Sequence, residues 1–330
     1  MKITIIGSDA YATSLANVLA DNHHNVIIYT ADEQQADEIN LNHKNSYYLD
    51  NLKINNKIKA TSSLLASLEN TEILILCFLS DDLNATLEKI INYSKREMIV
   101  VNARPSLDQN LKSLSNKIIN KLNDQKLLNK YAVIYAPNTA SEIINRKPVS
   151  FMVSATSLDD AKIVKQLFEN EYFKCLVSTD ILSCEVAHSF DKIVSLSAGI
   201  YSELKLGLNA TSNLIVILIN EIYQLINKIN GVELERTLNF VILSSFINKA
   251  FDVNCLEYKL GQAIVNYNKA STALDQLSYD LDKLEILKSI DKVSQMLETK
   301  NLFLNTLSKI LYNNYRPITL LTKVFVAFGS

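Results

Sequence analysis

The first thirty residues contain a strand–helix–strand pattern that restricts the fold more than any other feature of the sequence. Lys2–Ile6 is a β-branched run that ends at Gly7, which is typical of a buried parallel strand followed by a tight turn. Ala12–Asp21 then has apolar residues at helical spacing, and Asn25–Thr30 is a second strand-forming run. We therefore expect a sheet that begins with two parallel strands joined through a helix.

The same alternation continues to about residue 180. Patterns with helical spacing are Leu83–Ser94, Asn110–Leu122 and Leu158–Glu169. Further strand-forming runs are Glu72–Leu79, Met98–Asn102, Tyr131–Tyr135, Val149–Ser154 and Cys175–Ser178. This order predicts an α/β domain over residues 1–180, with a mostly parallel sheet, helices on both faces and the opening of a dinucleotide-binding Rossmann fold.

The pattern changes near Asp180. From there on, the long apolar stretches have helical periodicity, at Glu185–Glu203, Ser212–Lys228 and Ala273–Met296. We therefore predict an all-helical domain over residues 181–330.

The composition argues against several classes of protein. The chain has 330 residues, which is enough for two domains with cores of their own. The 33 basic and 35 acidic residues leave a net charge of −2, so no nucleic-acid partner is expected. Four scattered cysteines without CxxC spacing predict reduced thiols and no metal site. No leader peptide precedes the first strand and no stretch is long enough to span a bilayer, so a soluble cytoplasmic protein is expected.

The segment from Gly7 to Ala12 stands where a Rossmann fold has its glycine-rich phosphate-binding loop. Gly7 retains the glycine of the tight turn, but Asp9 replaces the glycine that lets the backbone approach a pyrophosphate. A carboxylate there would repel a diphosphate at the N-terminus of the helix. Alternatively, the loop only begins a helix, and Asp9 is its N-cap or an acid in its first turn. The sequence leaves both interpretations open.

Beyond this loop, the chain resembles the bacterial glycerol-3-phosphate dehydrogenases, closely over residues 1–215 and loosely to about residue 312. The stretch that begins EINLNHKNSYYLDNL resembles the family's link between its second and third strands. Ala136–Ile143 (APNTASEI) resembles its active-site turn, Ser189–Gly199 (SFDKIVSLSAG) its junction helix, and Gly207–Thr211 (GLNAT) its G-x-N-A-R segment.

The resemblance implies a nicotinamide dinucleotide as cofactor. The family has an arginine after the second strand, and Ala31 here removes that partner for a 2′-phosphate, so NAD is expected rather than NADP. The positions that match the family's cofactor contacts are Gly7, Ala10, Tyr11, Ala12, Tyr48, Arg104, Ala140 and Glu285.

The resemblance also implies an oxidoreductase that transfers hydride between NAD(H) and dihydroxyacetone phosphate or sn-glycerol 3-phosphate, feeding glycerophospholipid synthesis, and it allows a homodimer. Arg104 stands at the lysine of the family's T-K-G motif, and Asn138 matches the asparagine of its active-site turn. The general acid/base lysine falls on Asp191, with Lys192 beside it. One helical residue is about 100° of rotation, so Lys192 cannot simply replace that lysine.

Other departures affect the expected triose phosphate site. Thr211 replaces the N-A-R arginine, and a Ser-Arg-Asn loop is missing between Cys255 and Gly261. Charge-assisted contacts contribute about 1.5–3 kcal/mol each, so losing two would weaken substrate capture by orders of magnitude. The alternative function is therefore a catalytically impaired homologue that acts as a binding or structural protein. For Asp191 and Lys192, the alternative interpretation is an exposed charged pair on a helix.

Overall fold

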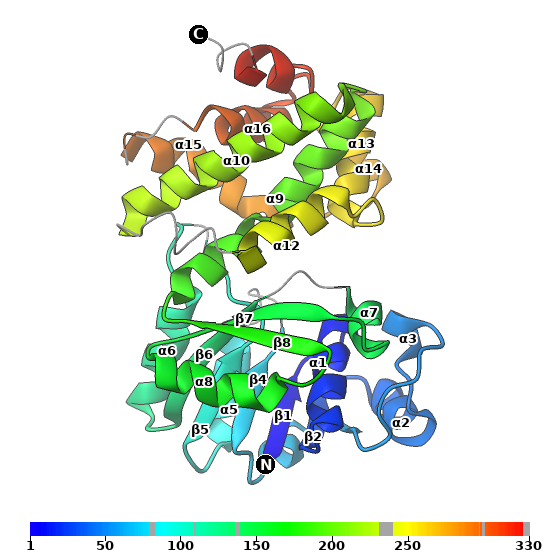
Figure 1. Ribbon diagram of the computed structural model, residues 1–330, viewed down its shortest axis with the longest axis vertical. Helices are drawn as coiled ribbons and strands as arrows, with labels where there is room; N and C mark the ends of the chain where they lie inside the picture. The colour runs from blue at the N-terminus through cyan, green and yellow to red at the C-terminus, as the bar shows by residue number, and fades with distance from the viewer. Residues whose placement is uncertain are drawn as a thin grey trace. The chain divides into compact units, whose positions relative to one another are not determined.

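A computed structural model describes residues 1–78, 83–108, 110–135, 139–230, 240–296, 298 and 301–325 of the chain. The chain forms two compact units (Figure 1). The first comprises Met1–Ser106 and Ser113–Glu185, and the second comprises Leu107–Lys112 and Val186–Ser330. The short segment Leu107–Lys112 contacts the rest of the second unit, because the Leu107 amide donates a 2.9 Å hydrogen bond to Ser189 Oγ.

The first unit is built on one eight-stranded sheet in the order β3-β2-β1-β4-β5-β6-β7-β8. All neighbouring strands pair in parallel except β6 and β7, which confirms the predicted mostly parallel sheet. The sequence pattern did not predict β3, a three-residue strand at the sheet edge that pairs only with β2. The strands are β1 Lys2–Ile6, β2 Asn25–Tyr29, β3 Lys59–Thr61, β4 Ile73–Leu76, β5 Met98–Asn102, β6 Leu128–Tyr135, β7 Val149–Ala155 and β8 Phe173–Ser178.

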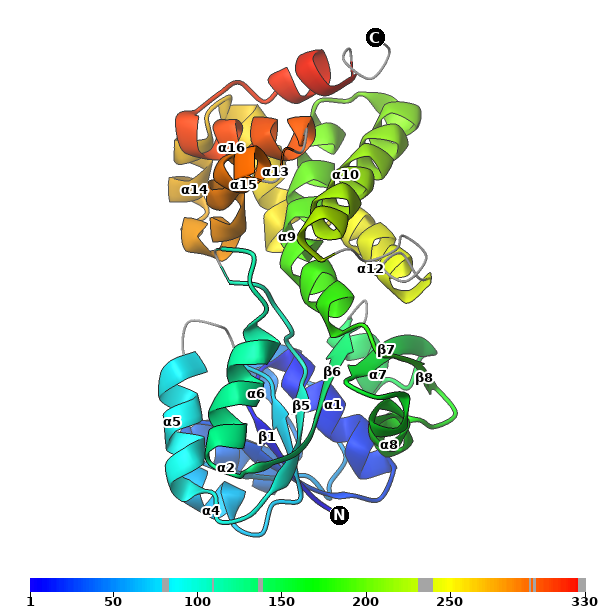
Figure 2. The ribbon, with the colours of Figure 1, turned by 90° about the vertical axis from the view of Figure 1, so that its left-hand side faces the viewer.

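Helices cover both faces of this sheet, as predicted (Figure 2). Helices α1, α7 and α8 pack together on one face, and α4, α5 and α6 pack on the other. The helices of this unit are α1 Ala10–Asp21, α2 Glu33–Asn42, α3 Ser46–Leu49, α4 Leu64–Leu68, α5 Leu83–Tyr93, α6 Leu114–Asp124, α7 Ala140–Ile144 and α8 Leu158–Phe168.

Side-chain caps set where several of these helices begin. Ser63, Ser113 and Ser157 each accept a hydrogen bond from a backbone N–H in the first turn of α4, α6 and α8, respectively. The predicted start of α6 at Asn110 was wrong, because Ser113 is the cap and the helix begins at Leu114.

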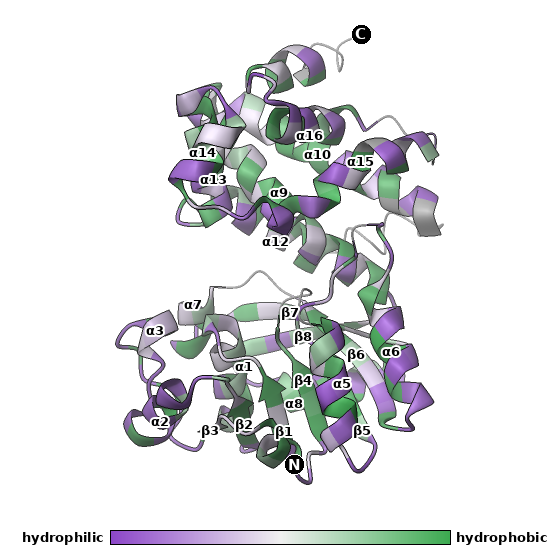
Figure 3. Cartoon of the chain, turned by 180° about the vertical axis from the view of Figure 1, so that it is seen from behind, coloured by the Kyte–Doolittle hydropathy of each residue, from purple (hydrophilic) through white to green (hydrophobic). Residues whose placement is uncertain are grey.

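The core of this unit lies along the central strands. Every residue of β4 is buried, and α1 is buried from Tyr11 to Ala20 because the sheet and two other helices enclose it. In Figure 3 the central strands are apolar, whereas α5 and α6 carry both apolar and polar residues. This is the pattern of a sheet buried on both faces beneath amphipathic helices.

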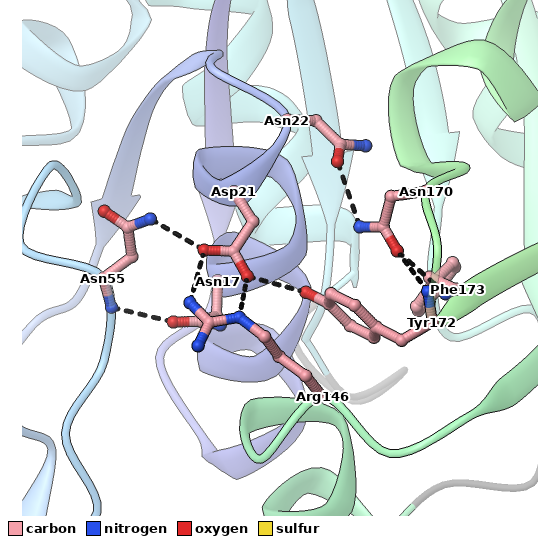
Figure 4. A network of polar contacts seen from close by, with 8 residues as sticks. All are labelled: Asn17, Asp21, Asn22, Asn55, Arg146, Asn170, Tyr172 and Phe173. Atoms are coloured by element: carbon pink, nitrogen blue, oxygen red, sulfur yellow. Dashed lines mark hydrogen bonds and ion pairs between the residues drawn. The ribbon is translucent and has the colours of Figure 1, made fainter.

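A polar network fastens the C-terminal end of α1 to three distant segments (Figure 4). The Asp21 carboxylate accepts two hydrogen bonds from the Arg146 guanidinium, at 2.9 and 3.1 Å. It also accepts one from the Tyr172 hydroxyl at 2.9 Å and one from Asn55 Nδ2 at 2.8 Å. Burial raises the pKa of Asp21, but the hydrogen bonds from Arg146, Asn55 and Tyr172 outweigh it and hold the pKa below its ordinary value.

The second unit is helical, as predicted. One prediction for this unit was wrong, because the single helix predicted over Ala273–Met296 is interrupted after Gln276. Ser278 adopts a left-handed conformation with φ of 47°, and Asp280 then caps the next turn. The helices are α9 Ile181–Glu203, α10 Gly207–Asn230, α12 Phe240–Phe251, α13 Leu256–Tyr267, α14 Ala270–Gln276, η2 Leu281–Leu284, α15 Glu285–Met296, α16 Leu302–Asn313 and η3 Leu320–Phe325.

Two glycines let α9 and α13 cross at backbone contact. A Cβ on Gly199 of α9 would lie 2.0 Å from the Tyr258 carbonyl oxygen of α13. A Cβ on Gly261 of α13 would lie 2.2 Å from the Leu196 carbonyl oxygen of α9. Each helix therefore supplies a glycine where the other helix's backbone approaches most closely.

We predict that Gly261→Ala destabilises the protein, although alanine is the better helix former by about 1 kcal/mol. The added methyl group meets backbone, which cannot rotate away, so the two helices must separate. The free energy of unfolding, measured by urea denaturation, should fall by about 1–3 kcal/mol. Lys259→Ala, on an exposed position of the same helix, is the control and should change it little. A Gly261→Ala protein as stable as the wild type would contradict the close crossing.

A second prediction concerns pH. The folded-state pKa of Asp21 is lowered, so its ionised form contributes stability that is present above the ordinary value of 3.8 and is lost as pH falls through the folded-state pKa. Asp21→Asn should therefore lower the free energy of unfolding by about 1–3 kcal/mol at pH 7. The difference from the wild type should shrink in titrations taken below pH 3.8. A difference that stays constant down to full protonation would show that charge plays no part.

Candidate functional site

The carboxyl ends of β1, β4 and β5 form the candidate site of the first unit. From β1 the chain moves outward to β2 and β3, and it then returns to the other side of β1 to form β4. The strand order thus reverses between β1 and β4. Open α/β sheets bind ligands at such a switch point, beyond the carboxyl ends of the strands.

Gly7 makes the turn from β1 to α1 possible. It has a φ of 124°, a conformation that residues with side chains rarely adopt. A Cβ on this residue would lie 2.2 Å from the carbonyl oxygen of Cys77, which follows β4. The backbone of the turn therefore runs directly against the end of β4.

Asp9 is the N-cap of α1, which was one of the two interpretations of this residue from the sequence. Its Oδ1 accepts a 3.0 Å hydrogen bond from the Ala12 amide, and its Oδ2 forms an ion pair with Arg104 Nη2. The carboxylate thus lies on the N-terminus of α1, where a Rossmann fold holds the pyrophosphate of its ligand.

Arg104 reaches this carboxylate from the loop after β5. Its backbone amide donates to Asn102 Oδ1 at 3.0 Å, and its guanidinium lies 5.8 Å from the centre of the Tyr11 ring. Burial raises the pKa of the nearby Cys77 thiol to about 12, so this thiol is uncharged at neutral pH. Asp9 is consequently the charged partner of Arg104.

Two polar side chains from outside the loop hold it in place. Gln35 Nε2 and Asn45 Nδ2 both donate to the Ser8 carbonyl oxygen, at 2.9 and 2.8 Å. Asn45 is fully buried and also donates to Thr13 Oγ1 of α1. We did not predict either residue, although Asn45 lies in the stretch EINLNHKNSYYLDNL that contributes to the resemblance.

The other predicted cofactor residues of this unit lie on the helices around the turn. Ala10, Tyr11 and Ala12 form the first turn of α1. Tyr48 lies on α3, and its pKa is raised by burial first and by the charge of Asp9 second, which places it within electrostatic reach of the loop. Ala140 begins α7, which packs against α1.

Asn138 and Glu285 were also predicted as site residues. Asn138 lies outside the described residues. Glu285 belongs to the second unit, where it begins α15 and is half-buried.

In the second unit, α9 carries the two residues predicted at the acid/base position. Asp191 is 7% exposed and its Oδ1 accepts a 3.2 Å hydrogen bond from Ser245 Oγ on α12. The interpretation of Asp191 and Lys192 as an exposed pair was therefore wrong, because Asp191 packs inside the helical unit and Lys192 is half-buried. The helical periodicity of the sequence did not predict that α12 covers the face of α9 that carries Asp191.

Lys192 lies within electrostatic reach of a buried carboxylate, Glu257, in the first turn of α13. Glu257 accepts hydrogen bonds from Cys255 Sγ at 2.9 Å and from the Tyr279 hydroxyl at 2.8 Å. Burial raises the pKa of Glu257, but these hydrogen bonds and the charge of Lys192 bring it below its ordinary value. Glu257 is thus an anion at neutral pH. No motif in the sequence indicated Glu257 or Tyr279.

Three further observations concern metal ions, membranes and disulfides. Among the residues that the structure describes, no group of three or more His, Cys, Asp or Glu side chains is arranged to hold a metal ion. Within the same residues, no helix is both long and apolar enough to cross a membrane. All four cysteines are free.

Comparison with solved structures supports this fold. Glycerol-3-phosphate dehydrogenase from Coxiella burnetii superposes with a TM-score of 0.84 at 19% identity, covering 98% of both chains. The enzyme of the same name from Saccharomyces cerevisiae gives 0.83 at 18% identity, covering 98% of this chain and 99% of that one. A D-mandelate dehydrogenase solved with NADH is more distant, at 0.56 and 12% identity, covering 95% of this chain and 98% of that one.

Sequence comparison gives the family. A protein named glycerol-3-phosphate dehydrogenase [NAD(P)+] from Mesoplasma florum is 37% identical over 98% of this chain and 97% of its own length. One of the same name from Clostridium botulinum is 24% identical over 96% of this chain and 94% of its own length. The family models for the N-terminus and C-terminus of NAD-dependent glycerol-3-phosphate dehydrogenase match residues 2–161 and 180–322. With both of its units matched and its NAD(P)-binding fold confirmed, this chain belongs to the NAD-dependent glycerol-3-phosphate dehydrogenase family.

Proposed function

We propose that this chain is an NAD-linked oxidoreductase that transfers hydride between NAD(H) and dihydroxyacetone phosphate or sn-glycerol 3-phosphate, and that it does so slowly. The match of both units to the family carries this proposal. In this proposal the protein acts in the cytoplasm as a homodimer and supplies glycerol 3-phosphate for glycerophospholipids.

The turn around Gly7 fits a dinucleotide, because it brings the N-terminus of α1 to the switch point of the sheet, where a Rossmann fold holds a diphosphate. Gly7, Ala10, Ala12 and Arg104 would hold the diphosphate, and Tyr48 and Ala140 would line its path. The bound cofactor would supply or accept the hydride at its nicotinamide.

The segment after β2 favours NAD over NADP. Residues 30–43 contain no lysine or arginine, and four of them are acidic: Asp32, Glu33, Asp37 and Glu38. Asp32 caps α2 by accepting hydrogen bonds from Gln34 N and Gln35 N. An extra 2′-phosphate at the start of this helix would therefore lie beside carboxylates, which repel it.

Lys192 is the group that we propose to exchange a proton with the substrate oxygen. Reduction of a ketone needs a proton at that oxygen as hydride reaches the carbon. The Glu257 carboxylate stabilises a positive charge on Lys192 Nζ. Asp191 cannot take this role as an anion, because it has no proton to donate and would repel the negative charge that develops on the oxygen. Arg104 and Asn138 are our candidates for orienting the substrate.

A second candidate function is a catalytically impaired homologue that binds a partner or ligand. The observation that favours it is the burial of Asp191. This residue stands at the family's acid/base position, and its carboxyl group accepts a hydrogen bond from Ser245 inside the helical unit. Thr211 adds to it, because its hydroxyl donates to the Gly207 carbonyl oxygen of its own helix and carries no charge for a phosphate. Measured turnover distinguishes the two candidates.

We predict that NADH binds and stabilises the protein more than NADPH. A ligand present at about 100 times its dissociation constant raises the free energy of unfolding by about 2.7 kcal/mol. Thermal denaturation with millimolar NADH should therefore show a higher midpoint, and NADPH should shift it less because of the acidic segment after β2. An equal or larger shift with NADPH would contradict the assignment of NAD.

We also predict slow reduction of dihydroxyacetone phosphate by the wild type, at least roughly a thousandfold below a typical family member, because the acid/base position holds Asp191. Lys192→Met should lower kcat by a further ~10²–10⁴-fold and remove the limb of the pH–rate profile that belongs to this amine. Lys259→Met, on the exposed side of α13, is the matched control. Unchanged kcat and pH profile in Lys192→Met would exclude Lys192 as the proton donor, and no turnover in any variant would favour the second candidate function.

A further inference from the structure

Asp9 and Arg104 are two departures from the family's pattern, and the structure brings them into contact. Asp9 replaces the second glycine of the loop, and Arg104 replaces the lysine of the T-K-G motif. They are 95 residues apart in sequence, yet Arg104 Nη2 forms an ion pair with Asp9 Oδ2. A negative charge at a phosphate site would be unfavourable by itself, and this pairing neutralises it.

The Asp9 carboxylate also occupies the donors that a diphosphate would need. Its two oxygens engage the Ala12 amide at the N-terminus of α1 and the Arg104 guanidinium. A bound diphosphate would take its hydrogen bonds from this helix terminus and its counter-charge from the nearest cation. The carboxylate therefore holds the position of the ligand's anion.

We propose that Asp9 is an internal competitor for the diphosphate site and that the Asp9–Arg104 pair determines how tightly this protein binds a dinucleotide. The proposal rests on the function proposed above. Binding requires Asp9 to turn away from Arg104, which then becomes available to the phosphates. The pair thus lowers affinity for dinucleotides without removing the cation that binds them.

Arg104 is well placed to take over once it is released. Its side chain is 19% exposed, its backbone amide is fixed by Asn102, and the Tyr11 ring lies beside its guanidinium. The Asp9 side chain is more exposed, at 34%, so it can move toward solvent. A guanidinium held in this way can form paired hydrogen bonds to a phosphate.

The decisive variant is Asp9→Asn, because asparagine caps a helix as well as aspartate does but carries no charge. Titration of the full-length protein with NADH, followed by calorimetry, should give a dissociation constant at least about tenfold lower than that of the wild type. Arg104→Gln should weaken binding, and the double variant should lose most of the gain from Asp9→Asn. Asp159→Asn, an exposed acid in the first turn of α8, is the control and should leave binding unchanged.

Inorganic pyrophosphate serves as a second probe, because it tests the anion site without nicotinamide. Tighter pyrophosphate binding by Asp9→Asn, with no NADH binding by either protein, would uphold Asp9 as a competitor for a diphosphate anion but reject both the dinucleotide as the ligand and the proposed function. NADH binding by the wild type that Asp9→Asn does not improve would reject the inference and leave the function standing. A gain fully retained in the double variant would also overturn the inference, because Arg104 would not be the group that Asp9 withholds. Asp9→Ser, which retains a capping hydroxyl, repeats the test if Asp9→Asn folds poorly.

Discussion

The close approach of the β1–α1 turn to the end of β4 is the constraint on which the first unit depends. Gly7 has room for no side chain there, because a Cβ would lie 2.2 Å from the Cys77 carbonyl oxygen. This contact points the N-terminus of α1 at the switch point of the sheet, one strand away from the loop after β5. Asp9 and Arg104 meet across the end of β4 for this reason, although neither is close to the other in sequence.

In the helical unit, glycines likewise allow a close backbone approach, here between two helices. Gly199 and Gly261 allow α9 and α13 to cross at backbone contact. Glu257, in the first turn of α13, is thereby held within electrostatic reach of Lys192 on α9. Because glycine has no side chain, the two helices cross closely, and this crossing also holds Lys192 near Glu257 elsewhere along the same helices.

Buried and half-buried carboxylates in this protein differ in the groups that compensate their charge, and their pKa values differ accordingly. Asp21 has a guanidinium and two further donors, and Glu257 has two donors and the charge of Lys192, so both pKa values lie below the ordinary range. Glu221 of α10 accepts hydrogen bonds from the Phe303 and Leu304 amides, which lower its pKa, but burial outweighs them and raises the pKa to about 7. Backbone amides at a helix N-terminus compensate this buried charge less completely than side-chain donors together with a cation compensate Asp21 and Glu257.

The sequence by itself determined the order of the elements and the fold class, because apolar periodicity and the Gly7 turn depend on residues that are near each other along the chain. It also located the β1–α1 turn and the α9 residues, since local motifs carry both. It did not determine β3 or the burial of Asp191, because each depends on a neighbour that is distant in sequence. The break at Ser278 is local, but the helical spacing of the apolar residues continues across it and did not indicate it. The tertiary structure alone decided that Asp9 is paired with Arg104 and that Lys192 lies near Glu257, since charge pairing depends on distance in space and no local pattern encodes that distance.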